Sequence, residues 1–210
     1  MEPKIVSFDL DGTLVKLDLI DRFWFEEVPK LYSKYHDMKL DDAVEFVRKS
    51  YGEVGPEEIG WYLPQYWFDE FGFEEDPEEV LEGVSHEVEV FQDARDVLEE
   101  LQGVYELIVV SNASREFLKA QLEEIKGYFS KTYSCVSDLE RVKKDVGVYR
   151  EVCEEIGIDP KDMVHVGDDQ EFDYNVPRHI GIRSFLIDRD GDCSNDGGVL
   201  RDLRELLDKI

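Results

Sequence analysis

Short apolar runs alternate with amphipathic segments along most of the chain, and the two patterns predict strands and helices in turn. Residues 4–9, Lys-Ile-Val-Ser-Phe-Asp, are mostly apolar and end at a glycine-containing turn, which is typical of a buried strand. Further runs of this kind occupy 106–110, 132–136, 163–166 and 183–187. Apolar residues recur at helical spacing in 94–101, 115–125, 148–156 and 199–207. This alternation predicts an α/β fold with a Rossmann-like, mainly parallel sheet and helices on both faces.

The alternation is interrupted between residues 16 and 89, where the pattern is helical throughout. Breaks are expected near Met38-Lys39, at 52–56 and near Asp76-Pro77. All three tryptophans of the chain lie in this stretch, with many of its other aromatic residues. We expect most of these rings to form the core of a small helical bundle, although a few could instead line a substrate pocket. The pattern therefore predicts an α/β core domain of residues 1–15 and 90–210, with a helical cap domain of residues 16–89 inserted after the first strand.

The hydrophobic content and the net charge of the chain limit the kinds of molecule that it is expected to bind. Hydrophobic residues make up 42% of the 210 residues, which is too many for a disordered chain. The net charge is −27 and no stripe of Lys and Arg offsets it, so nucleic acids and anionic membranes are not expected as partners. The chain contains no apolar run of the roughly 18–20 residues that a membrane helix needs. Residues 1–4 lead directly into the first strand-like run, so we expect no secretion signal there. We therefore expect a cytoplasmic protein that acts on a small molecule, as a monomer or a homodimer.

The three cysteines do not suggest a disulfide framework or a zinc site. Cys135, Cys153 and Cys193 are odd in number and show no Cys-x-x-Cys spacing. We expect ordinary reduced thiols.

Acidic and small polar residues follow three of the predicted strands. In chain order they are Asp9 and Asp11, Ser111 and Asn112, and Asp168 and Asp169. Ligands of an open parallel sheet bind outside the carboxyl ends of its strands, so we expect these residues to meet in one site. Two carboxylates about 4 Å apart repel each other by roughly 4 kcal/mol at an effective dielectric constant near 20. A hard divalent cation relieves this repulsion, and oxygen ligands without nearby His or Cys favour Mg²⁺, which usually accompanies a phosphate-bearing substrate.

The same segments resemble the signatures of the haloacid dehalogenase-like (HAD) hydrolases. Residues 9–13, Asp-Leu-Asp-Gly-Thr, resemble the first signature, and residues 109–112, Val-Val-Ser-Asn, the second. Residues 166–173, Val-Gly-Asp-Asp-Gln-Glu-Phe-Asp, resemble the fourth. The third is a lysine that opens a helix, and the register of residues 143–149, Lys-Lys-Asp-Val-Gly-Val-Tyr, favours Lys143 over Lys144. The phosphoglycolate phosphatase-like branch is the most similar, because its helical cap lies between the first two signatures.

The resemblance implies a role for each signature residue. Asp9 would attack phosphorus to form an aspartyl-phosphate, while Asp11 would protonate the leaving oxygen and then activate water. Lys143 would neutralise the developing charge. The implied cofactor is Mg²⁺, held by Asp9, by the backbone carbonyl of Asp11 and by Asp168, with Asp169 or Asp173 in support. The implied phosphate-binding residues are Gly12, Thr13, Ser111, Asn112 and Lys143.

Asp11 favours phosphate ester chemistry. Dehalogenases of this superfamily lack the second aspartate of the first signature, since they have no alkoxide to protonate. The expected function is therefore that of a Mg²⁺-dependent phosphatase, which hydrolyses the phosphate monoester of a small molecule. A phosphomutase acting on a sugar phosphate and a non-catalytic relative that binds a ligand or partner remain alternatives.

Several other polar residues have two interpretations. His165 lies in a predicted buried strand, and we expect a packed core residue rather than a ligand. Arg115 could reach a substrate anion or form a surface salt bridge. In the predicted cap, Arg22, Lys30 and Lys34 could meet a second anionic group of the substrate or belong to the ordinary surface.

Overall fold

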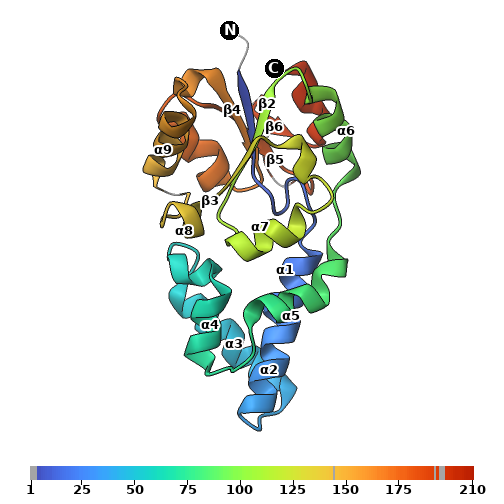
Figure 1. Ribbon diagram of the computed structural model, residues 1–210, viewed down its shortest axis with the longest axis vertical. Helices are drawn as coiled ribbons and strands as arrows, with labels where there is room; N and C mark the ends of the chain where they lie inside the picture. The colour runs from blue at the N-terminus through green and yellow to red at the C-terminus, as the bar shows by residue number, and fades with distance from the viewer. Residues whose placement is uncertain (1–3, 144, 192, 194–196) are drawn as a thin grey trace.

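The structure is a computed structural model that describes residues 4–143, 145–191, 193 and 197–210. In this part of the chain, six parallel strands form one sheet in the order β3-β2-β1-β4-β5-β6 (Figure 1). The strands are β1 (Ile5–Phe8), β2 (Glu106–Ser111), β3 (Lys131–Ser134), β4 (Met163–Gly167), β5 (Arg183–Ile187) and β6 (Val199–Leu200). The predicted α/β fold with a parallel, Rossmann-like sheet is confirmed.

Helices cover both faces of the sheet, because neighbouring residues of each strand point to opposite sides. Val6 and Phe8 belong to a buried cluster that also holds apolar residues of α6 (Gln92–Leu101) and α7 (Arg115–Gln121). Ile5 belongs to a second cluster, with residues of α9 (Val146–Ile156) and α10 (Val176–Arg178). In Figure 1, α6 and α9 lie on opposite sides of the strands. No helix in the described part of the chain is both long and apolar enough to cross a membrane.

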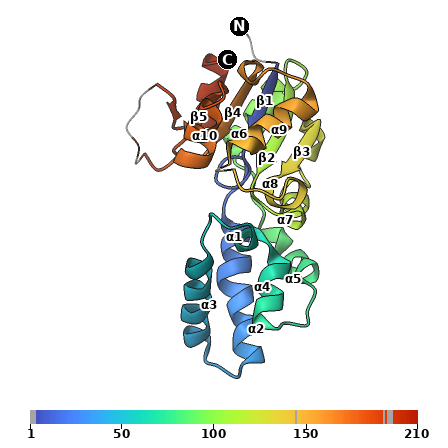
Figure 2. The same cartoon turned by 90° about the vertical axis from the view of Figure 1, so that its left-hand side faces the viewer.

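The helices between β1 and α6 form a separate group beyond the carboxyl ends of the strands (Figures 1 and 2). They are α1 (Asp18–Arg22), the π-helical turn η1 (Phe23–Glu27), α2 (Val28–Tyr35), α3 (Leu40–Val54), the 3-10 turn η2 (Ile59–Tyr62), α4 (Pro64–Phe71), α5 (Pro77–Val84) and the 3-10 turn η3 (Ser85–Glu87). At the start of α5 the side chain of Asp76 accepts a hydrogen bond of 2.8 Å from the backbone N–H of Glu78. The break expected at 52–56 falls late in that range, since α3 runs through Gly52 and ends at Gly55, where φ is +79°.

Most rings of this helical group pack against one another. The ring centroids of Tyr51 and Trp67 are 4.6 Å apart, and those of Trp67 and Phe71 are 5.4 Å apart. Trp67 is buried. The prediction of an aromatic bundle core is therefore confirmed for these residues.

Two chain segments connect the helical group to the sheet, and they pair with each other. Val15 and Val90 form an antiparallel bridge. The N–H of Lys16 donates to the carbonyl of Glu89 at 2.9 Å, and the N–H of Phe91 donates to the carbonyl of Leu14 at 3.0 Å. The segment that carries the first signature is thereby tied to the segment that leaves the helical group.

Three of the predicted elements need correction. The helix predicted at 199–207 is wrong: Val199 and Leu200 extend the sheet as β6, and only Leu203–Asp208 is helical, as the 3-10 segment η7. The apolar residues of 199–207 nevertheless recur at helical spacing, because β6 and η7 each bury their apolar side chains against the rest of the fold. The strand predicted at 132–136 ends at Ser134, whose hydroxyl caps the short helix α8 (Cys135–Asp138). The helix predicted at 115–125 ends at Gln121.

We expect the cysteines to differ sharply in reactivity. Burial raises the pKa of the Cys135 thiol to about 12 and that of Cys153 to about 11, whereas Cys193 is only partly buried. At pH 8 the reactive thiolate of Cys135 is therefore populated to roughly one part in 10⁴. A thiol reagent should label Cys193 first, and it should label Cys135 and Cys153 only after denaturant is added, as mass spectrometry of the labelled peptides would show. Labelling of Cys135 at the rate of Cys193 in the folded protein would contradict this.

Candidate active site

Three carboxylates converge where the central strands end. Asp9 follows β1 and remains tied to the neighbouring strand β4, because its N–H donates to the carbonyl of Val166 at 2.8 Å. Asp168 directly follows β4, and Asp173 lies in the π-helical turn η6 (Gln170–Asn175). One oxygen from each of these three carboxylates lies within 4.8 Å of the others. The parallel pairing of β1 with β4 thus brings the first and fourth signatures together.

A buried lysine lies among these carboxylates. The Nζ atom of Lys143 contacts Oδ1 of Asp9 and donates a hydrogen bond of 2.6 Å to Oδ1 of Asp173. Its backbone N–H donates to Oδ1 of Asn112 at 2.9 Å, which ties the lysine to the end of β2. The structure therefore places Lys143 at the site, whereas Lys144 lies outside the described residues.

Burial works against the negative charge of this cluster. It raises the pKa of Asp9 well above the usual value, with Asp173 and Asp168 adding to the shift and Lys143 opposing it. Desolvation of the carboxylate and, after it, the charge of Asp173 raise the pKa of Asp168 to about 7, although part of Asp168 is open to solvent. Lys143 behaves in the opposite way: burial alone would lower its pKa, but Asp173 and Asp9 outweigh burial and hold it well above normal. A further cation beside Asp9 and Asp168 would therefore favour their ionised forms.

A buried polar network holds the side chain of Asp173 in place. Burial alone would raise its pKa, but Lys143 and His165 outweigh burial and lower it. His165 Nε2 lies 3.0 Å from Asp173 Oδ1, His165 Nδ1 lies 2.9 Å from Ser7 Oγ, and the Tyr149 hydroxyl lies 3.1 Å from His165 Nε2. His165 is fully buried, which confirms its prediction as a packed core residue. The network fixes Asp173, and through Asp173 it orients Lys143.

Asp11 has a partner that the sequence did not suggest. The Nε2 group of Gln121, in α7, donates a hydrogen bond to Asp11 Oδ1, and Gln121 is fully buried. Burial raises the pKa of Asp11 to about 6, while Gln121 and Lys143 oppose the shift. The available signal was a polar residue on the buried face of a predicted helix, next to Phe117 and Leu118. Gln121 therefore fixes the orientation of the Asp11 carboxylate.

The first signature loop is held by a residue far along the chain. Arg189 donates to the carbonyls of Gly12 and Thr13 at 3.2 and 2.8 Å, and it pairs with Asp93 at 2.7 Å. No local pattern marks Arg189 for this role, because 176 residues separate it from Thr13.

The predicted phosphate-binding residues do not all share one environment. Ser111 and Asn112 line the same cavity as Asp9, Asp11 and Lys143. Gly12 lies against Asp168, and Thr13 is fully buried. The Thr13 hydroxyl has no hydrogen-bond partner among the described residues.

The cavity has a volume of about 600 Å³ and extends from the carboxylates to the helical group. Trp24, Trp61 and Tyr62 are among the residues that line it on the side of the helical group. The Tyr62 hydroxyl accepts a hydrogen bond of 3.3 Å from Asn112 Nδ2, so the two parts of the chain touch beside Lys143. Some rings of the helical group thus form the bundle core, whereas others line this cavity.

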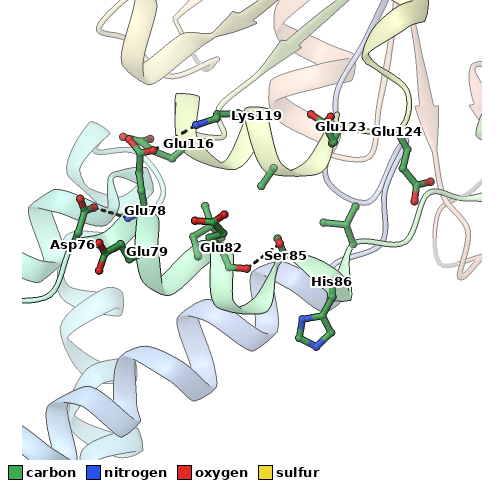
Figure 3. A pocket seen from close by; sticks show the side chains of 13 residues that line it. Asp76, Glu78, Glu79, Glu82, Ser85, His86, Glu116, Lys119, Glu123 and Glu124 are labelled. Carbon is green, nitrogen blue, oxygen red and sulfur yellow. Dashed lines mark hydrogen bonds and ion pairs between the residues drawn. The ribbon is translucent and has the colours of Figure 1, made fainter.

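A second cavity of about 550 Å³ lies between α5 and α7 (Figure 3). Its lining is mostly acidic, and Lys119 Nζ lies 3.6 Å from Glu78 Oε2 across it. None of the predicted site residues contributes to it. The candidate active site is therefore the cavity at the strand ends.

The other basic residues with two interpretations form ion pairs away from this cavity. Arg115 pairs with Asp138 and donates to the Thr132 carbonyl at 3.1 Å, which confirms the salt-bridge interpretation. Arg22, Lys30 and Lys34 pair with glutamates of the helical group, and they do not line the cavity.

Gly12 is expected to tolerate no side chain. Its φ is +71°, and a Cβ atom there would lie 2.2 Å from Asp168 Oδ2. Gly12→Ala should therefore lower the free energy of unfolding by about 2 kcal/mol, as measured by chemical denaturation. Gly83→Ala, in α5 with open space around it, is the matched control and should leave stability unchanged or raise it by up to about 1 kcal/mol. An unchanged stability of Gly12→Ala would show that the loop adapts.

Comparison with known proteins agrees with the arrangement of these residues. A family model described as a haloacid dehalogenase-like hydrolase matches residues 3–181. A stretch of 69 residues is 30% identical to the GMP/IMP nucleotidase YrfG of Escherichia coli (strain K12), and this match spans 33% of the chain and only 31% of that relative.

Two solved structures share the fold over nearly the whole length of both chains. A HAD phosphatase from Thermococcus onnurineus is 23% identical, with a TM-score of 0.88 and coverage of 100% of this chain and 97% of that one. The magnesium-bound HAD-hydrolase YfnB of Bacillus subtilis is 16% identical, with a TM-score of 0.70 and coverage of 100% and 99%. With a family model that spans most of the chain and the signature residues gathered at one sheet edge, this protein belongs to the haloacid dehalogenase-like hydrolases.

Proposed function

We propose that this hydrolase is a Mg²⁺-dependent phosphatase, which cleaves the phosphate monoester of a small molecule through an aspartyl-phosphate on Asp9. The observation that carries the proposal is the convergence of Asp9, Asp168 and Asp173 with Lys143 in the lining of a cavity of about 600 Å³. Phosphoryl transfer needs little beyond a positioned nucleophile and neutralisation of charge, and this cluster supplies both.

In this mechanism Asp9 attacks phosphorus, and the ester oxygen leaves with a proton from Asp11. Because its pKa is raised to about 6, roughly a tenth of Asp11 is protonated at pH 7, far more than of an ordinary aspartate, and this protonated form can act as the general acid. Because Gln121 holds Oδ1 of Asp11, we place the transferable proton on Oδ2. Once the leaving group departs, the same carboxylate takes a proton from the water that hydrolyses the aspartyl-phosphate. Lys143 and Ser111 bind phosphoryl oxygens, and Lys143 offsets the charge that develops on them.

The donor set suits magnesium. Asp9, the backbone carbonyl of Asp11 and Asp168 would hold the ion through oxygen atoms, with Asp169 and Asp173 behind them. The raised pKa values of Asp9 and Asp168 show that both carboxylates carry their charge at a cost, which a divalent cation would relieve. A bound Mg²⁺ would supply positive charge that offsets the negative charge of the phosphoryl group. Gly12 leaves the space beside Asp168 that any side chain would fill.

The helical residues 16–89 are proposed to act as a cap domain over a core domain of residues 1–15 and 90–210. Tyr62 reaches Asn112 from the cap side, and the paired segments at Val15 and Val90 connect the two parts. The cap would shield the aspartyl-phosphate from bulk water and choose the leaving group.

Asp11 supports a phosphatase rather than a dehalogenase. A halide leaves without a proton, whereas an alkoxide needs the general acid that Asp11 can provide. The name of the relative YrfG describes a nucleotidase, which is also a phosphate monoester hydrolase.

The proposal is tested by steady-state hydrolysis of an aryl phosphate with and without metal. We expect turnover with Mg²⁺, a loss of at least about 100-fold after EDTA, and recovery when Mg²⁺ is added back. Turnover that is insensitive to EDTA would contradict the metal-dependent mechanism. Failure to hydrolyse any member of a broad phosphate ester panel would contradict the phosphatase itself.

A further inference from the structure

The cavity wall that faces the carboxylates from the cap is made largely of aromatic rings. Trp24, Phe25, Trp61 and Tyr62 all line it, and each is partly exposed. Because the cavity has polar groups at the Asp9 end and rings on the cap side, it can take a ligand that is charged at one end and flat and apolar at the other.

The rings that line the cavity are held in place by other side chains. Trp24 stacks on Phe117 with centroids 5.8 Å apart and an interplanar angle of 25°, and it meets the edge of Tyr51 at 5.6 Å. Trp61 meets Tyr62 at 4.9 Å, and its carbonyl accepts a hydrogen bond of 3.2 Å from the Trp67 indole. A ligand that stacks on these rings would therefore pay little to order them.

The charges of the cavity disfavour a second anionic group on the substrate. Among the described residues that line it, Lys143 is the only basic one, and it already pairs with Asp9 and Asp173. Asp21 and Glu57 bring further negative charge on the cap side. The guanidinium of Arg48 lies 4.5 Å from the Phe25 ring centroid, but Arg48 does not line the cavity.

We infer that the leaving group of the substrate carries a planar aromatic ring system and no second anion, as the nucleoside of a 5′-monophosphate does. This inference rests on the proposed phosphatase function. The rings supply stacking surfaces for a base, and the carboxylate of Asp21 is an acceptor suited to a ring N–H donor. A compact trimethylammonium group would also suit rings and carboxylates, but it would leave most of this 600 Å³ cavity filled with water.

Inosine 5′-monophosphate and ribose 5-phosphate form the test pair, because they share the same scissile bond and differ at C1 of the ribose, which bears a base in the first and a hydroxyl group in the second. With Mg²⁺ present, kcat/KM should be at least tenfold higher for inosine 5′-monophosphate, since stacking a base on aromatic side chains contributes roughly a factor of ten or more. Phosphoglycolate and a sugar bisphosphate, which each carry a second anion, should rank with ribose 5-phosphate or below it.

Trp61 is the cap residue to change. Trp61→Ala should lower the ratio of the two kcat/KM values by about tenfold, mainly through the KM of the nucleotide, and Trp61→Phe should restore most of the ratio. Phe46→Ala is the matched control: Phe46 is an exposed cap ring outside the cavity, and its loss should leave the ratio at the wild-type value.

Each other outcome has a distinct meaning. Equal kcat/KM for the test pair, a preference for phosphoglycolate or phosphocholine, or an unchanged ratio in Trp61→Ala would overturn this inference while leaving the phosphatase intact. Failure to hydrolyse all of these esters, aryl phosphates included, would overturn the proposed function and this inference with it.

Discussion

Replacing Asp9 by asparagine is expected to lower kcat for phosphate ester hydrolysis by at least about 10⁴-fold. An amide of the same shape cannot attack phosphorus, so the covalent path is lost while the cavity keeps its form. The fold should persist, because Lys143 retains its 2.6 Å bond to Asp173 and burial already disfavours the charge on Asp9. Steady-state kinetics and chemical denaturation of the variant measure the two effects.

The phosphoenzyme gives an independent measurement. Wild-type protein that is quenched with acid during turnover of a phosphate ester should show a mass increase of one phosphoryl group on the peptide that contains Asp9. Asp9→Asn treated in the same way should show none. Asp41→Asn, an exposed change of the same kind in α3, is the matched control and should behave like the wild type. Activity of Asp9→Asn within tenfold of the wild type would rule out Asp9 as the nucleophile.

Replacing Lys143 by methionine is expected to destabilise the fold by about 3–5 kcal/mol in metal-free buffer near pH 8. The change removes the cation from a buried cluster and leaves Asp9 and Asp173 facing each other without it. Urea unfolding at fixed pH would measure this loss. Lys161→Met, which removes a surface pair with Asp159, is the control and should cost less than about 1 kcal/mol.

The destabilisation should depend on pH with a definite sign. Without Lys143, the folded-state pKa values of Asp9 and Asp173 should both lie above the unfolded value near 3.8. Carboxyl groups with raised folded pKa values lose stability as pH rises through the interval between the two values. The deficit of Lys143→Met relative to the wild type should therefore be smaller at pH 4 than at pH 8. A deficit that grows towards acid pH would contradict this explanation.

The alternation of strands and helices could be predicted from the sequence, because short, continuous apolar runs of four to six residues are typical of strands in a sheet whose two faces are both covered. The corrections fall where two short elements follow one another. Val199 and Leu200 look like the first turn of a helix until β5 is present to pair with them. Ser134 ends β3 early, since its hydroxyl caps the next helix.

The site shows the same division. Asp9, Asp11 and Asp168 could be named in advance, because short signatures at strand ends carry local information. Gln121 and Arg189 could not be paired with their partners, since 110 residues separate Gln121 from Asp11 and 177 separate Arg189 from Gly12. Such pairs depend on how the helices pack, which no local pattern records.

Local patterns in the amino-acid sequence were thus sufficient to predict the fold class and the chemical groups that meet at the strand ends. Only the folded chain decided how those groups are charged, since burial raises the pKa values of Asp9 and Asp168 while Lys143 and His165 hold that of Asp173 down. It also decided which aromatic residues face the cavity and which fill the bundle core, because rings such as Trp61 and Trp67 differ in position and not in type. The physical reason is that both burial and charge interaction depend on distances between residues remote in sequence, and these exist only after packing.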